Sequence, residues 1–336
     1  MPAAPEISVL LPVFEGAATL RACLTSIARQ THRDWECVVV DDGSSDRSLE
    51  IARRAVELDS RFRVVSRPHR GLVSALNTGI ANCRGRTIAR MDADDLMHRE
   101  RLASQAAALD ASPELAAVGC GVRLFPRRSL GPGMRRYERW LNSIDSAERV
   151  VADAFVECPV AHPTLVIRRE VLLELGYRDA GWPEDYDLIL RMIAARKPIG
   201  VVRRRLLAKR SGARALSAAS ETYATGRFTA CKAAFLARAF LAADRHYVLW
   251  GYGATGRALR RALCEHDRTP AAIVELHPGR IGNTIHSAPV IRPDELAAWR
   301  ELPLVVSVAG DEARQSIRAD LERRGYRELR DYVCAA

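Results

Sequence analysis

Short apolar runs alternate with segments of helical periodicity over the first 110 residues. Residues 7–11 form an apolar run that predicts a strand, and the next apolar side chains recur three and four positions apart, which predicts one buried helix face. Further strands are predicted at residues 37–40, 62–65 and 87–89, with a helix between each pair. This alternation is typical of a mostly parallel α/β sheet with helices on both faces.

The pattern changes after residue 110 and again near residue 245. Strands are expected at residues 116–122 and 164–167, an irregular basic stretch at 127–139, a helix at 185–196, a basic run at 203–210 and an Ala-rich helix ending near 243. A second alternation predicts strands at residues 247–250, 271–274 and 303–308. We therefore expect a large α/β domain at residues 1–215, a helical linker at 216–243 and a small Rossmann-like domain at 244–336.

Composition fits two folded domains and narrows the range of partners. The 336 residues are 48% hydrophobic and 27% charged, as in ordinary globular proteins. The net charge of +10 comes almost wholly from arginine, since only Lys197, Lys209 and Lys232 are lysines. The arginines are spread along the chain without a nucleic-acid-binding signature, so no nucleic-acid partner is expected, whereas peripheral contact with an anionic membrane surface stays open.

The cysteines and the apolar runs point to a reducing compartment. Eight cysteines are scattered without a CxxC pair, and we expect them to be reduced and buried. No apolar stretch reaches about 18 residues, and the first residues lack a basic region ahead of an apolar one. We expect a cytoplasmic protein, with attachment to the inner face of the membrane left open.

Polar side chains follow three of the predicted strands. Phe14-Glu15 comes after the first, Asp41-Asp42 after the second and Asp92–Asp95 after the fourth. Ligands of parallel sheets bind beyond the carboxyl ends of the strands, so these places are expected to line one cleft. Residues 92–94 form a DxD triplet, whose carboxylates can hold a divalent cation that bridges diphosphate oxygens. The alternative is a solvated acidic turn ahead of the next helix.

Several linked segments resemble the family-2 glycosyltransferases of the GT-A fold. They agree in order and spacing and cover about residues 5–215. The segments are ISVLLPVF at 7–14, Ser26-Ile27 with Gln30-Thr31, VVVDDGSS at 38–45, GLVSALNTG at 71–79, DADD at 92–95 and EDYDL at 184–188 with Arg191. The resemblance implies an inverting, metal-dependent transferase of polysaccharide biosynthesis. Its donor would be a nucleoside-diphosphate sugar, with uridine favoured, and its acceptor a hydroxyl of a glycan or a lipid-linked molecule.

The resemblance also assigns roles to single residues. Asp94 is implied as the ligand of a divalent cation, Mn²⁺ or Mg²⁺, with Asp95 in support. Nucleotide-sugar contacts are implied for Pro12, Val13, Phe14, Glu15, Asp42, Arg70, Asp92, Ala93 and Arg210. Arg210 would belong to a basic loop that covers the diphosphate and excludes water. The family's first motif ends in Tyr-Asn, where this chain has Phe14-Glu15.

Residues near 160 and 185 are implied on the acceptor side. Asp185 is implied as the general base that takes the proton of the acceptor hydroxyl. The alternative is a carboxylate at the positive end of a helix, a role that Asp187 would suit equally well. Glu184 and His162 are implied as contacts to acceptor or metal, and a structural histidine is the alternative for His162. No QxxRW sequence occurs, which favours addition of a single sugar over processive synthesis.

A glycine fingerprint opens the C-terminal domain. Gly251, Gly253 and Gly256 follow a predicted strand, and Glu275 stands about 20 residues beyond, where an acid can meet a ribose hydroxyl. Nucleotide or nucleotide-sugar binding, a structural or oligomerising role, and NAD-dependent catalysis stay open. NAD is least favoured, because no lysine lies beyond Lys232 to complete a hydride-transfer set. The alternative function is an NAD- or nucleotide-sugar-binding oxidoreductase or sensor acting through this domain, in a chain that could form homo-oligomers.

Two other classes of function are compatible with an α/β architecture of this kind. Nucleotidyltransferases that make sugar nucleotides carry a GxGxRxxP-type loop after the first strand, and residues 12–18 lack it, which excludes this class. A binding module without catalysis stays open. Cleavage of a donor that depends on Asp185 would rule it out.

Overall fold

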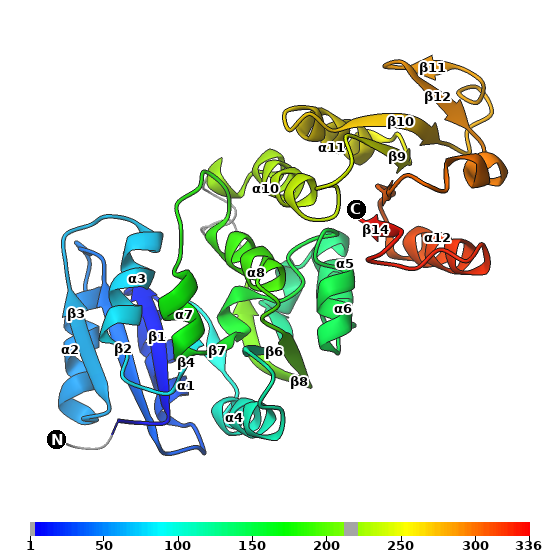
Figure 1. The fold of residues 1–336 in the computed structure, drawn as a ribbon. Helices are drawn as coiled ribbons and strands as arrows, with labels where there is room; N and C mark the ends of the chain where they lie inside the picture. Colours follow the sequence, from blue (N-terminus) through cyan, green and yellow to red (C-terminus); the bar gives the residue numbers. More distant parts are fainter. Residues whose placement is uncertain (1–3, 212–220) are drawn as a thin grey trace. The chain divides into compact units, whose positions relative to one another are not determined.

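The computed structural model describes residues 4–211 and 221–336, and the chain divides into two compact units. Unit 1 comprises the residues up to 150 together with 160–180 and 187–219, and unit 2 comprises 151–159, 181–186 and 220–336. The expected domain boundary at residue 215 and the start of the expected linker lie outside the described residues. Each unit is built around a sheet of its own (Figure 1).

Unit 1 contains an eight-stranded sheet in the order β3-β2-β1-β4-β7-β6-β8-β5. β1 to β4 are parallel and β6 is parallel to β8, whereas β7 and β5 run antiparallel to their neighbours. The mostly parallel sheet predicted from the sequence is thus confirmed. The strands are β1 (Ile7–Val13), β2 (Trp35–Asp41), β3 (Phe62–Ser66), β4 (Thr87–Arg90), β5 (Leu96–Met97), β6 (Ala117–Phe125), β7 (Val166–Arg168) and β8 (Ile199–Arg210).

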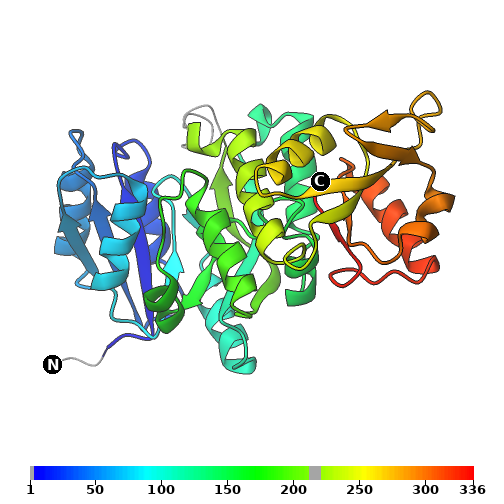
Figure 2. The same cartoon turned by 45° about the horizontal axis from the view of Figure 1, so that its top comes forward.

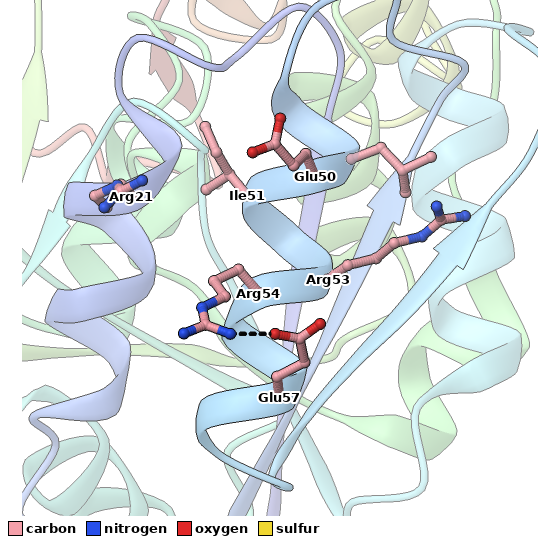
Figure 3. Close-up of a pocket in the computed structure, with 7 residues that line it drawn as sticks. Arg21, Glu50, Ile51, Arg53, Arg54 and Glu57 are labelled. Atoms are coloured by element: carbon pink, nitrogen blue, oxygen red, sulfur yellow. Dashed lines mark hydrogen bonds and ion pairs between the residues drawn. The ribbon is translucent and has the colours of Figure 1, made fainter.

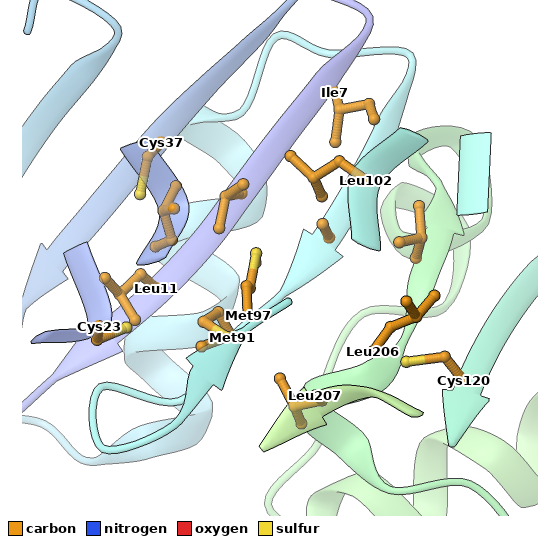
Figure 4. Close-up of a cluster of buried hydrophobic side chains, with 14 of the residues drawn as sticks. Ile7, Leu11, Cys23, Cys37, Met91, Met97, Leu102, Cys120, Leu206 and Leu207 are labelled. Atoms are coloured by element: carbon orange, nitrogen blue, oxygen red, sulfur yellow. The ribbon is translucent and has the colours of Figure 1, made fainter. Parts of the chain in front are cut away.

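Helices cover both faces of the first strands. Successive strand residues point to opposite faces, so the apolar side chains of each strand pack against helices on both sides. Leu11 and Cys37 share one buried cluster with Cys23 of α1 (Figure 4). On the other face α3 approaches so closely that a Cβ on Gly79 would lie 2.0 Å from Leu10 Cδ1, which explains the glycine. The longer helices are α1 (Leu20–Ala28), α2 (Ser48–Leu58), α3 (Leu72–Asn82), α4 (Arg101–Ala111), α5 (Pro132–Leu141), α6 (Ala147–Ala152), α7 (Arg169–Leu175) and α8 (Glu184–Ala194).

Three stretches of unit 1 differ from the sequence prediction. The basic stretch at 127–139 is largely helical, because α5 begins at Pro132. Within this helix only Glu138 and Leu141 are buried, so its buried face is narrow. The basic run at 203–210 is the second half of β8, with Arg203–Arg205 exposed between buried positions. The strand expected at 164–167 begins only at Val166, after a short 3₁₀ turn over His162–Thr164.

Unit 2 contains a six-stranded sheet in the order β11-β12-β10-β9-β13-β14. All neighbouring strands are parallel except β11 with β12. Helices lie beside this sheet, and Figure 2 shows them together with its strands. The elements are α10 (Thr225–Arg238), β9 (His246–Trp250), α11 (Ala254–Cys264), β10 (Thr269–Val274), β11 (Thr284–Ile285), β12 (Ala288–Ile291), β13 (Leu304–Val306), α12 (Asp311–Arg323) and β14 (Tyr332–Cys334).

Alternating residues of the second sheet separate two cores. Leu249 and Val305 belong to a cluster with Leu259 of α11, whereas Val248 and Val306 belong to a cluster on the other face, with residues of α12. The burial therefore sets which side of each strand faces which helix. Within residues 4–211 and 221–336, no helix is both long enough and apolar enough to span a bilayer.

The cysteines follow the expectation with one exception. All eight are free thiols, and seven are buried as small apolar side chains. Cys264 is partly exposed, because it is the last residue of α11. The prediction that every cysteine is buried is wrong at this position.

Candidate functional site

Three carboxylates gather in the turn between β4 and β5, which we call the acid turn (residues 92–95). One oxygen from each of Asp92, Asp94 and Asp95 lies within 4.8 Å of the others. Asp95 is 1% exposed, and its Oδ2 has no hydrogen-bond partner among the described residues. A buried carboxylate oxygen without a donor is costly unless something positive binds it. The donor set is therefore of the kind that suits a hard divalent cation.

Neighbouring strands bring positive groups to the acid turn. Arg90, the last residue of β4, forms an ion pair with Asp92. From the end of β8, the backbone N–H of Arg210 donates to Asp95 Oδ1 at 2.6 Å, and the Arg210 Nε donates to the carbonyl oxygen of Asp94 at 3.0 Å. Arg210 is thus the last residue of a strand, instead of belonging to the expected basic loop, but it does contact the turn.

The three carboxyl groups of the acid turn differ in acidity. Burial alone would raise the pKa of Asp92, but the charges of Arg90 and Lys209 bring it below its usual value. Burial and the charge of Asp92 raise the pKa of Asp94. The same two causes raise the pKa of Asp95, against the opposing charge of Lys209. Asp92 is therefore the most acidic of the three carboxyl groups.

Arg90 and Lys209 are site residues that the sequence reasoning missed. Burial lowers the pKa of Lys209, but the three carboxylates of the acid turn outweigh burial and raise it. One signal was available, since Lys209 is one of only three lysines in an arginine-rich chain and stands beside Arg210. Arg90 offered none, because its approach to Asp92 follows from the turn after β4.

The loop after β1 lies next to the acid turn. A Cβ on Gly16 would be 3.7 Å from the Cβ of Ala93, and the Cys23 thiol donates to the carbonyl oxygen of Asp92 at 3.3 Å. Pro12 and Val13 are buried at the end of β1. The structure thus brings the first predicted motif together with the DxD triplet, at the carboxyl edge where β1 and β4 are paired.

Phe14 presents an aromatic surface beside this edge. Its side chain is 50% exposed, and its ring stacks on the imidazole of His69, with ring centroids 4.0 Å apart. Exposed large apolar side chains that are held in place are suited to stacking against a flat ligand. The sequence reasoning included Phe14 but missed His69.

Asp42 is held in place by the segment 67–71. Its carboxylate pairs with Arg67 Nε and His69 Nδ1, both at 2.9 Å, and accepts the backbone N–H groups of Arg70 and Gly71. The two backbone N–H groups are the hydrogen-bond donors to this carboxylate among the described residues. Two oxygens offer about four acceptor sites, so acceptor capacity remains for a ligand N–H. Arg70 contributes its backbone here, and its side chain is exposed.

Glu15 fastens two loops together. Its Oε1 accepts the Ser45 backbone N–H at 2.7 Å and the Ser45 hydroxyl at 2.9 Å, and its own N–H donates to Ser44 Oγ. The backbone of Glu15 has φ +51°, a conformation that costs free energy in a residue with a side chain. These contacts indicate that Glu15 positions the loop that carries Phe14.

His162 is a buried, neutral histidine. It is 5% exposed, and its Nε2 lies 2.6 Å from the hydroxyl of Tyr177. Burial, reinforced by the charges of Arg90 and Lys209, brings its pKa well below the usual value. The hydrogen bond and the burial agree with the structural alternative. The proximity of Arg90 and Lys209 also places His162 near the acid turn.

The three carboxylates at the start of α8 differ in burial and in their partners. Asp187 is fully buried and pairs with Arg178 and Arg191, so it holds the fold together. Asp185 is partly exposed, and its Oδ1 accepts the N–H of the next residue at 2.7 Å. Glu184 is 4% exposed and accepts a hydrogen bond of 2.6 Å from the Tyr223 hydroxyl within unit 2. Asp185 and Glu184 belong to unit 2, whereas the acid turn belongs to unit 1.

The remaining candidates form a separate group in unit 2. Gly251 and Gly253 lie between β9 and α11, and Gly256 lies in the first turn of α11, as the fingerprint predicts. Glu275 directly follows β10 and accepts the N–H of Tyr252 at 2.9 Å. The structure therefore brings the fingerprint and its acid together.

A surface pocket lies elsewhere on unit 1, between α1 and α2 (Figure 3). Arg54 and Glu57 form an ion pair on its wall. Its lining is Arg21, Leu49, Glu50, Ile51, Arg53, Arg54 and Glu57. None of these residues belongs to the predicted site. The carboxylates that could bind a cation lie in the acid turn instead.

Comparisons with known proteins show the family of the chain. A family model described as Glycosyl transferase family 2 matches residues 8–176. The O-antigen biosynthesis protein RfbC of Myxococcus xanthus is 33% identical over 244 residues, which cover 68% of this chain and 17% of RfbC. The chain spans less than half of the length of several curated relatives.

Solved structures share the fold of the chain. S. aureus TarS 1-349 in complex with UDP-GlcNAc has a TM-score of 0.53 at 18% identity, covering 78% of this chain and 72% of that one. The mannosyltransferase PcManGT from Pyrobaculum calidifontis, in complex with GDP-Man and Mn²⁺, has a TM-score of 0.51 at 20% identity, covering 97% and 82%. These neighbours confirm the GT-A fold expected from the sequence.

Proposed function

The chain belongs to glycosyl transferase family 2, and on that premise we propose that it transfers a sugar from a nucleoside diphosphate to a hydroxyl group. One observation carries the proposal: three carboxylates converge within 4.8 Å at the carboxyl edge of β4. We infer a uridine-based donor, inversion at the transferred carbon, and a glycan or lipid-linked acceptor. The O-antigen role of the relative RfbC favours an acceptor of the glycan type.

The acid turn is suited to a divalent cation, Mn²⁺ or Mg²⁺. Asp94 and Asp95 would hold it, with Asp92 facing the ribose side, and the unpartnered Asp95 Oδ2 is the atom that most needs a positive ligand. When bound, the cation neutralises charge on the departing diphosphate. The Mn²⁺ and GDP-Man bound by PcManGT agree with this assignment.

The chain's own groups around the turn add to this binding. Arg210 and Lys209 bring positive charge from the end of β8, so they can attract diphosphate oxygens. Phe14 and His69 offer a stacked pair of rings against which a base can lie. We propose that Asp42 orients residues 67–71, whose backbone N–H groups donate to it, and that its remaining acceptor capacity serves the base.

Asp185 is proposed as the group that takes the proton of the acceptor hydroxyl. Asp185 is a partly exposed carboxylate, whereas Asp187 forms ion pairs with Arg178 and Arg191. An inverting transfer needs such a base to activate the attacking oxygen. Glu184 is proposed to hold the start of α8 through Tyr223.

The test is binding followed by turnover. Thermal midpoints of the full chain would be measured with UDP, GDP and CDP, each with Mn²⁺ or with EDTA, because a ligand of the folded state raises the midpoint. We expect a shift with UDP that needs Mn²⁺ and is lost in Asp94→Asn. Donor turnover should then be lost in Asp185→Asn and kept in Asp110→Asn, which changes an exposed carboxylate on α4.

The outcomes separate the parts of the proposal. A metal-dependent shift with GDP or CDP alone would reassign the base and keep the transferase. A UDP shift that is equal with EDTA and unchanged in Asp94→Asn would contradict the metal site. Full turnover in Asp185→Asn would remove the assigned base.

A further inference from the structure

The glycine loop of unit 2, residues 251–256, contains one glycine that the fold does not need. Gly251 has φ +95°, and a Cβ on Gly256 would lie 2.1 Å from the Gly251 carbonyl oxygen, so the fold requires both. Gly253 has φ −72°, and a Cβ there would meet nothing within 4 Å. A side chain at 253 would point into open space. Glycine at this position is what a ligand that approaches the backbone closely would require.

The strand order places this loop where ligands bind in open parallel sheets. By their order along the chain, the five parallel strands are arranged third, second, first, fourth and fifth (β12-β10-β9-β13-β14). The direction of winding therefore reverses between β9 and β13. Ligands of such sheets bind beyond the carboxyl ends of the strands at this reversal. The glycine loop follows β9, and Ser307 follows β13.

Ser307 supplies an independent sign of a missing ligand. It is 1% exposed, and its hydroxyl has no hydrogen-bond partner anywhere in residues 4–211 and 221–336. Alternation along the strand puts it on the face of Val305, which packs with α11. The Thr255 hydroxyl in the first turn of α11 donates to the Ser307 carbonyl oxygen at 3.3 Å. The unpartnered hydroxyl therefore lies under the start of α11, beside the glycine loop.

The start of α11 is open to an anion. This helix has 11 residues, no side chain caps its first N–H groups, and its first turn contains no acidic residue. Uncapped N–H groups and the helix dipole together favour a phosphate. Gly253 to Thr255 are exposed, so a phosphate can reach them.

A carboxylate stands beside the loop at the end of the adjacent strand. Glu275 Oε1 accepts the Tyr252 N–H at 2.9 Å and pairs with Arg280 Nη1 at 2.8 Å. Arg280 also donates to the Tyr252 carbonyl oxygen at 3.2 Å, and its side chain is 39% exposed. Arg280 can therefore swing away and leave Glu275 to accept hydrogen bonds from a ribose diol.

We propose that unit 2 is a Rossmann-like domain with a second nucleotide site. In this site the glycine loop and the start of α11 bind a diphosphate, Ser307 donates its hydroxyl to a phosphate oxygen, and Glu275 accepts from the ribose. The ligand class is a ribosyl diphosphate, from either a dinucleotide or a nucleoside-diphosphate sugar. This site is separate from the acid turn and does not depend on the proposed transfer reaction.

The first test titrates the full-length Asp94→Asn protein in EDTA, so that the acid turn does not contribute, with NAD⁺, UDP and UDP-glucose by calorimetry. Gly253→Val should abolish binding without lowering the thermal midpoint, because its side chain fits the fold. Gly226→Val is the matched control, since a Cβ at Gly226 in α10 also meets nothing within 4 Å. The control should bind as its parent does.

A second variant tests the buried hydroxyl. Ser307→Ala should weaken binding about three- to tenfold, the effect of one hydrogen bond. Its thermal midpoint should not fall, because the hydroxyl has no partner to lose. A merely structural serine would leave the affinity unchanged.

Each outcome decides the proposal. Binding of NAD⁺ alone that depends on Gly253 supports a dinucleotide site, and binding of UDP or UDP-glucose that depends on Gly253 supports a nucleoside-diphosphate site. No binding of any of the three at millimolar concentration, or binding that Gly253→Val leaves intact, overturns it. If Gly253→Val both lowers the thermal midpoint and abolishes binding, the affinity of Ser307→Ala decides the proposal.

Discussion

The acid turn of unit 1 and the glycine loop of unit 2 both follow a parallel strand, yet they are built from opposite chemistry. The acid turn presents three carboxylates at a strand end and can meet a phosphate only through a cation. The glycine loop carries no charged side chain between 251 and 256 and presents backbone N–H groups directly. A phosphate group can thus be bound either through a bridging cation or directly by backbone N–H groups.

The lysines repeat this contrast. Lys209 in unit 1 is surrounded by carboxylates, which outweigh burial and raise its pKa. Lys232 in unit 2 donates to the carbonyl oxygens of Val156 and Ala335, and burial lowers its pKa to about 8. At Lys209 three carboxylates outweigh burial, whereas at Lys232 the charge of Glu157 and two carbonyl dipoles compensate burial only in part.

The largest effect should come from the acid turn. Asp94→Asn should lower sugar transfer by about a hundredfold or more, because a metal ion contributes several kcal/mol to such a reaction. Initial rates at saturating donor and Mn²⁺ measure this, with Asp110→Asn as the control. Equal rates in the two variants would show that the acid turn does not act through a cation.

The glycine loop should instead respond through stability. Gly256→Ala should lower the free energy of unfolding of unit 2 by about 1–3 kcal/mol, because its methyl group would overlap the Gly251 carbonyl. Gly253→Ala should be close to neutral. Hydrogen exchange of the β9 and β10 amides compares the two. Equal losses would mean that both glycines serve the fold alone.

Lys232 should give unit 2 a pH dependence. Its pKa is about 8 in the folded chain and near 10.5 when unfolded, so the unfolded chain binds more protons between these values. Stability should therefore rise as pH increases through this window, by about 1–2 kcal/mol. The difference in thermal midpoint between wild type and Lys232→Met, followed from pH 8 to 10, measures it. A difference that stays constant or reverses would contradict the lowered pKa.

The smallest effect concerns the charge beside the acid turn. Lys209→Met removes a positive charge next to three carboxylates, so Mn²⁺ should bind about three- to tenfold more tightly. Calorimetric titration of Mn²⁺ measures this, and Lys197→Met serves as the control because Lys197 pairs with Glu174 on α7. Unchanged or weaker binding would place Lys209 outside the field of the turn.

Local pattern predicted the strand ends well. The polar residues after β1, β2 and β4 lie at the carboxyl edge because a parallel sheet collects these ends. Asp92, Asp94 and Asp95 were therefore predictable as a group. The glycine loop was predictable for the same reason, since its spacing is set by one strand and one helix.

Partners contributed by distant strands were predictable only through the family resemblance, which named Arg210 but not Lys209. Lys209 and Arg210 reach the acid turn because β8 pairs with β5 at the sheet edge, with Leu96 opposite Ala208. Such long-range pairing leaves no local signal. The hydrogen bonds to Asp42 were missed as well, since their donors are backbone groups of residues 70 and 71.

The anchoring of the acid turn has a thermodynamic consequence. Only residues 91–95 separate β4, in the middle of the first sheet, from β5 at its edge. A segment this short between two strands of one sheet has little conformational entropy left to lose. The carboxylates are therefore preorganised, so a cation should bind in a single fast phase, and most of its binding free energy should be available to the ligand that follows.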